Sequence, residues 1–133
     1  MKELKFVNQE VITKFQTSDG EVYNRKDKAE LHEQFLVFEE RVCKLKHIGG
    51  AYYCETQEDF DAIVDMYAYA YPVWVYCSST YKPDYCYSKK DFKGSDWYFF
   101  KHEYQNDAPD DYWVETLSEK KAEWEEFYQQ FEI

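Results

Sequence analysis

The first element that the pattern of polar and apolar residues predicts is a β-hairpin over residues 11–23. Two extended stretches, 11–16 and 21–23, flank a turn that contains Asp19 and Gly20. Glycine adopts a positive φ at no steric cost, and aspartate accepts it more readily than most residues. The pair therefore favours a tight hairpin turn.

A long helix is predicted next, with Asn24 as its N-cap and its end near Lys46. Apolar residues recur at spacings of four and three, as on one buried face of a helix. This face comprises Leu31, Phe35, Phe38, Val42 and Leu45, widened by Leu36 and Cys43. A heptad seam for dimerisation is the alternative, but the pattern is short for a coiled coil, so packing against the core is favoured.

Residues 51–55 are predicted to form a short strand, and a second helix is predicted to follow it. Thr56 is expected to cap this helix, with Asp59 completing a capping box, and Pro72 is expected to end it. Its apolar face comprises Phe60, Ile63, Val64, Tyr67 and Tyr71. Residues 73–77 are apolar without alternation, which predicts a strand covered on both faces. This order permits a right-handed parallel crossover, and an antiparallel arrangement stays open.

Two more strands and a helix are predicted after a polar, tyrosine-rich connection over residues 78–95. The strands cover residues 97–104 and 112–117, with a loop of turn-forming residues between them. Ser118 is expected to cap the final helix. The apolar stripe of that helix comprises Ala122, Trp124, Phe127, Tyr128 and Phe131.

The element order ββαβαβββα defines an α+β fold, with one mainly antiparallel sheet of about five or six strands and three helices laid on it. The length suits a single domain, residues 1–133. Within it, residues 1–48 form the hairpin and long helix, and residues 49–133 form an acidic, aromatic-rich remainder. Aromatic residues make up 21% of the chain, which argues against disorder. No membrane span or leader is found, so a cytoplasmic protein is expected.

The four cysteines, Cys43, Cys54, Cys77 and Cys86, lack C-x-x-C spacing and have no histidine at zinc-site intervals. We therefore expect no metal or cofactor, and four reduced thiols that pack as small hydrophobes. Cys43 lies in a helical pattern and Cys77 in an apolar run, so both are expected to be buried. Two disulfides, or a nucleophilic cysteine–histidine pair that meets only in the folded chain, stay as alternatives.

Motifs that carry catalysis are absent from the sequence. There is no phosphate-binding loop, dinucleotide fingerprint, G-x-S-x-G or H-E-x-x-H sequence. His32 and Glu33 lie on the predicted long helix, where a surface pair is favoured over a proton-transfer dyad. The aspartates at 107, 110 and 111 lack the glycine turn and ligand spacing of an EF-hand loop. These observations favour a protein without enzymatic activity.

The formal net charge of −11 comes from one part of the chain. Residues 1–50 carry nine basic and nine acidic side chains, whereas residues 51–133 carry seven basic and eighteen acidic ones. This balance speaks against a general nucleic-acid binder, because contact with phosphates requires cationic side chains. It predicts either a solvated, solubilising face or a docking surface for a basic partner, whose encounter a negative field accelerates.

For the docking alternative, tyrosine and tryptophan side chains among the carboxylates provide rigid anchors. Tyr81, Tyr85 and Tyr87 in the tyrosine-rich connection are expected to stay partly exposed, as in a binding loop. A sheet edge covered by amphipathic rings is the alternative for them. The candidate partner-binding residues are Asp107, Asp110, Asp111, Tyr112, Trp113, Glu115, Glu119, Glu123, Tyr81 and Tyr85.

Residues 17–33 resemble the pattern T-x-D-G-x-x-[FY]-x(5)-A-x-x-H-E of small accessory proteins in bacteriophages and prophages. The matching positions are Thr17, Asp19, Gly20, Tyr23, Ala29, His32 and Glu33. The resemblance covers only the N-terminal part of the chain, and it implies a hairpin that leads into a helix and expression in a bacterial cytoplasm. Small, acidic phage proteins without enzyme motifs are similar in character to anti-CRISPR proteins and other host-defence inhibitors.

These observations predict a phage-type, non-enzymatic inhibitor that binds a host defence protein, such as a CRISPR effector or another nuclease. Its acidic, aromatic surface would compete with nucleic acid for a basic groove, without direct contact with nucleic acid or membrane. One alternative is a nucleotide- or small-molecule-binding anti-defence protein with a pocket around Tyr52, Trp74 and Tyr76. Residues 51–81 contain no cationic side chain for an anionic ligand, which weakens this alternative. Another alternative is a structural protein that assembles through the tyrosine-rich connection, for example as a homodimer.

Overall fold

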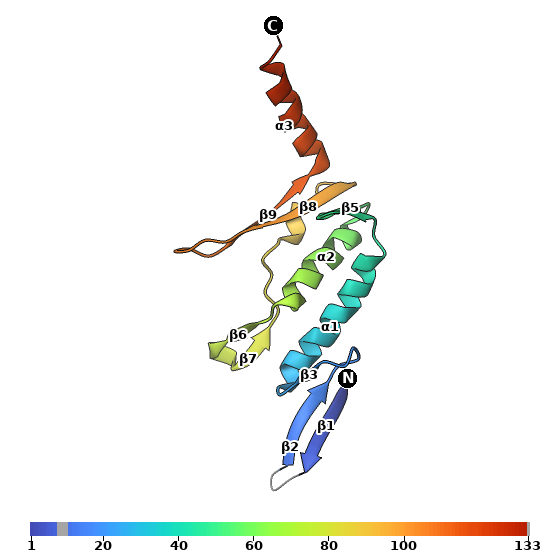
Figure 1. Cartoon of the computed structure of the whole chain (residues 1–133), viewed down its shortest axis with the longest axis vertical. Helices are drawn as coiled ribbons and strands as arrows, with labels where there is room; N and C mark the ends of the chain where they lie inside the picture. The colour runs from blue at the N-terminus through green and yellow to red at the C-terminus, as the bar shows by residue number, and fades with distance from the viewer. Residues whose placement is uncertain (8–10, 133) are drawn as a thin grey trace.

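The computed structural model describes residues 1–7 and 11–132, whose strands form three antiparallel sheets (Figure 1). The first sheet contains, in spatial order, β1 (Lys2–Val7), β2 (Val11–Gln16) and β3 (Val22–Tyr23). The second contains β4 (His47–Ile48), β5 (Ala51–Cys54), β8 (Asp96–Glu103) and β9 (Asp111–Thr116). The third contains β6 (Val73–Val75) and β7 (Thr80–Lys82). The helices are α1 (Lys26–Cys43), α2 (Gln57–Ala70) and α3 (Leu117–Gln129), with 3-10 turns η1 (Tyr76–Ser78) and η2 (Lys89–Asp91).

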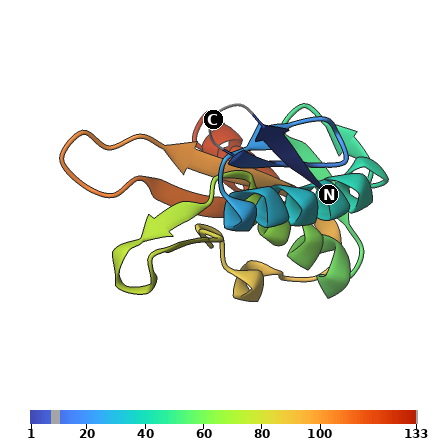
Figure 2. The ribbon, with the colours of Figure 1, turned by 90° about the horizontal axis from the view of Figure 1, so that it is seen from below.

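The α+β class predicted from the sequence is confirmed, but the strands do not join into one sheet. Helices α1 and α2 lie side by side in the middle of the molecule, with the first sheet at one end and the second sheet across the other (Figure 1). The parallel crossover is not formed, because β5 pairs antiparallel with β8 and β6 pairs antiparallel with β7. Two hairpins, the β6–β7 hairpin (residues 73–82) and the β8–β9 hairpin (residues 96–116), project from the same side of the body (Figure 2).

The predicted hairpin over residues 11–23 is confirmed as β2 and β3. It is extended by β1, an additional strand that the sequence analysis missed and that pairs with the whole of β2. Asn24 does not cap α1, because Arg25 occupies the N-cap position without a side-chain cap. Instead the carboxylate of Asp27 accepts a hydrogen bond from the N–H of Lys28 at 2.9 Å. A carboxylate in the first turn also interacts favourably with the helix dipole.

The core lies between α2 and the second sheet, with Phe60 at its centre. The ring centroid of Phe60 lies 5.0 Å from that of Tyr98 and 5.4 Å from that of Phe100, both on β8. The predicted capping box is confirmed: Thr56 Oγ1 accepts the N–H of Asp59 at 3.2 Å, and the Asp59 carboxylate accepts the N–H of Thr56 at 3.3 Å. The core residues are Val42, Cys54, Phe60, Ala62, Ile63, Val64, Tyr87 and Tyr98.

The prediction that residues 73–77 form a strand covered on both faces is wrong. Strand β6 lies in the two-stranded sheet of the β6–β7 hairpin, where Trp74 is exposed and Tyr76 is 87% exposed. Contacts with the start of α1 hold this hairpin in place. The guanidinium of Arg25 lies 4.6 Å from the centre of the Trp74 ring, and the Asp27 carboxylate accepts hydrogen bonds from β7. Apolar content alone does not bring a strand into the core.

Several residues differ in exposure from the expectation. Cys43 and Cys77 are exposed rather than buried, because α1 packs through a narrower face than predicted and the β6–β7 hairpin stands away from the core. Tyr71 is 79% exposed, because it follows the end of α2 and leaves the helical face. Tyr87 is buried, and its hydroxyl donates to the carbonyl oxygen of Lys101 at 3.0 Å. The four cysteines are free thiols.

The final helix does not lie on the sheet. Thr116 rather than Ser118 caps it, because the Thr116 hydroxyl accepts the N–H of Glu119 at 3.1 Å. Residues 121–132 are all exposed, and Figure 1 shows α3 extending away from the body. A helical period identifies an apolar side of a helix but does not say what covers it.

Candidate functional site

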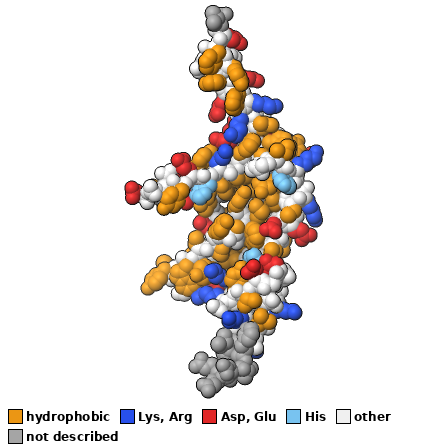
Figure 3. All heavy atoms as spheres, viewed as in Figure 1, with side chains coloured by type: hydrophobic (Ala, Val, Ile, Leu, Met, Phe, Trp, Pro, Cys, Tyr) orange, Lys and Arg blue, Asp and Glu red, His pale blue; other side chains and the backbone are white. Residues whose placement is uncertain are grey.

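Among the described residues, exposed aromatic side chains gather along α3 and the turn that follows it, and we call this set the aromatic face of α3. It comprises Trp124, Phe127, Tyr128 and Phe131, which are between 51% and 67% exposed. Their spacing is i, i+3, i+4 and i+7, so the four rings lie along one side of the helix and the turn that follows it. The rings contact one another, with centroids 5.9 Å apart for Trp124 and Tyr128. Figure 3 shows these hydrophobic side chains on the projecting helix, beyond the body.

Two ion pairs hold the base of α3, one to the segment before β8 and one to β9 of the second sheet. Lys93 Nζ lies 2.6 Å from Glu119 Oε1, and Lys120 Nζ lies 3.0 Å from Glu115 Oε2. Hydrogen bonds from these lysines lower the pKa of the Glu119 and Glu115 carboxyls. Lys120 also lies 4.8 Å from the centre of the Phe99 ring on β8. The helix is therefore held at its start, and the aromatic face begins where those contacts end.

The candidate partner-binding residues lie in three places. The β8–β9 hairpin carries Asp107, Asp110, Asp111, Tyr112, Trp113 and Glu115. Glu119 and Glu123 lie on the first turns of α3. Tyr81 lies on β7, between Lys28 at 4.7 Å and Trp74 at 5.2 Å, and Tyr85 follows in the segment after β7. The structure places Glu115 beside the start of α3, where it pairs with Lys120. The three aspartates lie at the opposite end of the hairpin, and the two tyrosines lie elsewhere.

Half of the candidate carboxylates have a cationic or imidazole neighbour. Besides Glu115 and Glu119, Asp110 Oδ2 lies 2.9 Å from Nε2 of His102. The backbone N–H of Gln105 and then His102 lower the pKa of Asp110. Asp107, Asp111 and Glu123 form no ion pair in the part of the chain that the structure describes. These carboxylates therefore form no single unneutralised patch, and they contribute mainly to the long-range negative field.

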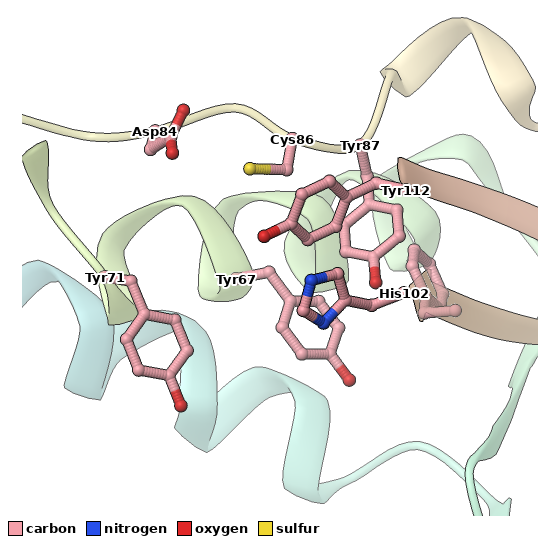
Figure 4. A pocket seen from close by; sticks show the side chains of 8 residues that line it. Tyr67, Tyr71, Asp84, Cys86, Tyr87, His102 and Tyr112 are labelled. Atoms are coloured by element: carbon pink, nitrogen blue, oxygen red, sulfur yellow. The ribbon is translucent and has the colours of Figure 1, made fainter. Parts of the chain in front are cut away.

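A cavity of about 490 Å³, which we call the tyrosine cavity, lies between the two projecting hairpins. It is lined by Tyr67, Tyr71, Asp84, Cys86, Tyr87, Phe100, His102 and Tyr112. Figure 4 shows Asp84 and Cys86 on the segment that follows β7, opposite α2, with His102 and Tyr112 coming from β8 and β9. The imidazole of His102 stacks on Tyr112, with centroids 4.4 Å apart. This cavity was not predicted from the sequence, because its lining comes from segments that are far apart along the chain.

The tyrosine cavity does not assemble a nucleophile with a base. Burial and then the neighbouring Asp84 raise the pKa of the Cys86 thiol, which disfavours the reactive thiolate. In the described part of the chain, no hydrogen bond joins Cys86 to His102, whose Nε2 binds Asp110 instead. The arrangement suits binding rather than covalent catalysis.

The pocket predicted around Tyr52, Trp74 and Tyr76 is not formed. The ring of Tyr52 packs on Phe100 at 6.3 Å, within the second sheet. Trp74 packs on Tyr81 in the β6–β7 hairpin, and Tyr76 points into solvent. The ring of Tyr52 therefore lies in the second sheet, apart from Trp74 and Tyr76 in the β6–β7 hairpin.

No family model, curated protein or solved structure matches this chain. Over residues 1–7 and 11–132, no group of three or more His, Cys, Asp or Glu side chains is placed to hold a metal ion. Within the same ranges no helix has the length and apolar character needed to cross a membrane.

Proposed function

We propose that this chain is a non-catalytic binding protein whose helix α3 docks in an apolar groove of a partner protein. The observation that carries the proposal is the aromatic face of α3. Helices that bind in grooves present apolar anchors at i, i+3, i+4 and i+7, which is the spacing of Trp124, Phe127, Tyr128 and Phe131. Contiguous exposed apolar side chains mark interaction sites, and large aromatic residues dominate binding energy at interfaces.

The charge around the aromatic face indicates the chemistry of the partner. Residues 117–132 contain five glutamates and two lysines, a net charge of −3. One of these lysines, Lys120, is already paired with Glu115. A groove with a basic rim complements this helix, and electrostatic attraction accelerates the encounter. Two copies of α3 packed together would place a charge of −6 at one interface, so a different protein is favoured over a second copy.

A narrower proposal concerns the identity of the partner. The resemblance of residues 17–33 to small phage proteins supports a host defence protein in a bacterial cytoplasm as the target, such as a CRISPR effector or another nuclease. Proteins that hold nucleic acid are basic at their binding surface, and the net charge of −11 suits approach to such a surface. In this proposal α3 supplies the specific contacts, and the carboxylates of the β8–β9 hairpin supply attraction at a distance.

The experiment is site-specific photo-crosslinking in a bacterial lysate. The amino acid p-benzoylphenylalanine is placed at position 127 on α3 or, as the control, at Val37, an exposed apolar residue of α1. We expect one protein to be cross-linked from position 127 and not from position 37, with a yield that falls as salt rises. The double variant Trp124→Ala/Phe127→Ala should lose capture in a pull-down of the same partner, whereas Val37→Ala should retain it.

Three results would contradict the proposed function. One is cross-linking to the same proteins from both positions, and another is unchanged capture by the double variant. The third is cross-linking from position 127 to a second copy of the chain, together with a dimer in sedimentation velocity. That last result would favour the assembly alternative.

A further inference from the structure

The tyrosine cavity presents aromatic rings on two sides of an open space. The ring of Tyr87 lies 5.3 Å from that of Tyr67 and 5.4 Å from that of Tyr112. Tyr71 lies across the gap from this cluster and is 79% exposed (Figure 4). Aromatic faces carry negative electrostatic potential and attract cations held within about 6 Å of the ring centre. The rings therefore favour the binding of a positively charged group in the cavity.

Asp84 adds a carboxylate to the lining. Its backbone N–H donates to the carbonyl oxygen of Ala68 at 2.9 Å, which holds the segment after β7 against α2. Among the described residues, the Asp84 carboxylate takes part in no ion pair. The Asp84 side chain neighbours the thiol of Cys86, which is a weak hydrogen-bond donor. The carboxylate is thus available to a cation that enters the cavity.

The rest of the lining excludes an anionic ligand. Among the described residues that line the cavity there is no lysine or arginine, so a phosphate or carboxylate group would meet Asp84 without a counter-charge. His102 is the remaining basic group, and its Nε2 binds Asp110. The volume of about 490 Å³ falls within the range of roughly 300–1,000 Å³ in which small groups are bound.

We propose that the tyrosine cavity binds the guanidinium group of an arginine side chain presented by a partner protein. A guanidinium ion is flat, so it stacks on aromatic rings, and its N–H groups match the two oxygens of a carboxylate. A lysine ammonium is more strongly hydrated and has no planar face. Rings on two sides and the carboxylate of Asp84 are therefore complementary to arginine.

This site is separate from the aromatic face of α3. The cavity lies at the start of β9 and the end of α2, whereas α3 leaves the other end of β9. A basic partner could use both surfaces, but neither requires the other. Failure of one proposal therefore leaves the other in place, and the two are tested with different probes and variants.

The test is an NMR titration of the full chain with Nα-acetyl-L-arginine N-methylamide. We expect saturable shifts of the ring resonances of Tyr71 and Tyr112. The citrulline counterpart, in which a neutral urea replaces the guanidinium at nearly the same shape, should bind at least about tenfold more weakly. The lysine counterpart should also bind more weakly than the arginine probe. Free arginine should not bind more tightly than the capped probe, because no lysine or arginine among the described lining residues can pair with its carboxylate.

Two variants make the assignment specific. Asp84→Asn keeps the shape and removes the charge, and it should weaken arginine binding by at least about tenfold. Tyr71→Leu removes one ring from an exposed position that the core does not use, and it should also weaken binding. Asp107→Asn, which makes the same change in net charge at the tip of the β8–β9 hairpin, should leave binding unchanged, as should Trp124→Ala on α3.

The proposal is overturned if the citrulline or lysine probe binds as tightly as the arginine probe, or if Asp84→Asn binds like the unchanged protein. Shifts confined to residues outside the cavity would also overturn it. Tighter binding of free arginine than of the capped probe would overturn the assignment to a protein side chain, because it would indicate a site for the free amino acid.

Discussion

Nε2 of His32 lies 2.7 Å from Oδ2 of Asp19, and this contact joins the turn before β3 to the N-terminal half of α1. The other carboxylate oxygen of Asp19 accepts a hydrogen bond from the hydroxyl of Thr17. Next to it, the carboxylate of Glu33 accepts hydrogen bonds from the backbone N–H and the hydroxyl of Ser18. Thr17 is buried under this junction. These contacts within residues 17–33 therefore attach the N-terminal hairpin to the helix.

The Asp19–His32 contact predicts an effect of pH on stability. Hydrogen bonds from His32 and then Thr17 lower the pKa of Asp19 to about 2, below the value of about 3.9 expected in the unfolded chain. The stabilisation is therefore complete above about pH 4 and is lost as the pH falls toward about 2. Asp19→Asn should melt at a lower temperature than the unchanged protein at neutral pH, and the difference should shrink below about pH 4.

Circular dichroism melts between about pH 2 and pH 7 measure this difference. Asp107→Asn, at an exposed position without an ion pair among the described residues, is the matched control and should melt like the unchanged protein throughout. A gap between Asp19→Asn and the unchanged protein that stays constant down to the lowest pH would show that the contact contributes no pH dependence.

Asp27 holds the β6–β7 hairpin against the start of α1. Its carboxylate accepts hydrogen bonds from Arg25, from the hydroxyl of Thr80 and from the N–H of Tyr81, the last two at 2.9 Å. Asp27→Ala should lower the free energy of unfolding by about 2 kcal/mol, because charged hydrogen bonds of this kind are lost. Hydrogen exchange should also accelerate across residues 73–82. Glu30→Ala is the control, because Glu30 forms one exposed ion pair, with Lys26 at 3.9 Å. This variant should change neither the free energy of unfolding nor the rate of hydrogen exchange in residues 73–82.

The contrast between Phe60 and Trp124 tests which aromatic residues belong to the core. Phe60 is fully buried, so Phe60→Ala should cost about 4 kcal/mol in urea denaturation. Trp124 is 59% exposed on α3, so Trp124→Ala should change stability by no more than about 0.5 kcal/mol. A large loss of stability in Trp124→Ala would mean that α3 packs against the body in solution, which would remove the basis for the proposed docking helix.

The four cysteines should differ in reactivity according to their burial. Cys43 and Cys77 are exposed, and iodoacetamide near pH 8 should modify them first. Cys54 is fully buried, and burial raises the pKa of its thiol to about 12, so it should react only after unfolding. Peptide mass spectrometry at successive times gives the order. Early modification of Cys54 in the folded chain would contradict the described core.

Elements that depend on neighbouring residues could be predicted from the sequence. The turn at Asp19 and the capping box of Thr56 and Asp59 are formed as expected, because each is built from residues a few positions apart. The separation into three sheets could not be predicted in this way. The place of β6 depends on Arg25 and Asp27, about fifty positions earlier, and a local pattern carries no information about that contact.

Burial of the aromatic residues was the least predictable property. The stripe containing Trp124 and Phe127 has the same period as a core-facing helix, and the sequence does not distinguish a stripe covered by its own chain from an exposed one. Tyr87 lies in a segment rich in polar residues, yet three-dimensional packing on Phe100 at 5.1 Å buries it. The tyrosine cavity depends on such contacts between distant segments, so the sequence analysis gave no indication of its place.

The attachment of α3 only at its base has an evolutionary consequence. Residues 121–132 support no part of the core, so substitutions there leave the rest of the molecule able to fold. Under the proposed function, recognition and folding would therefore be under separate selection in this chain. A partner that escaped by altering its groove would be matched by changes in one short helix, and the same body would acquire a new target by exchanging that helix.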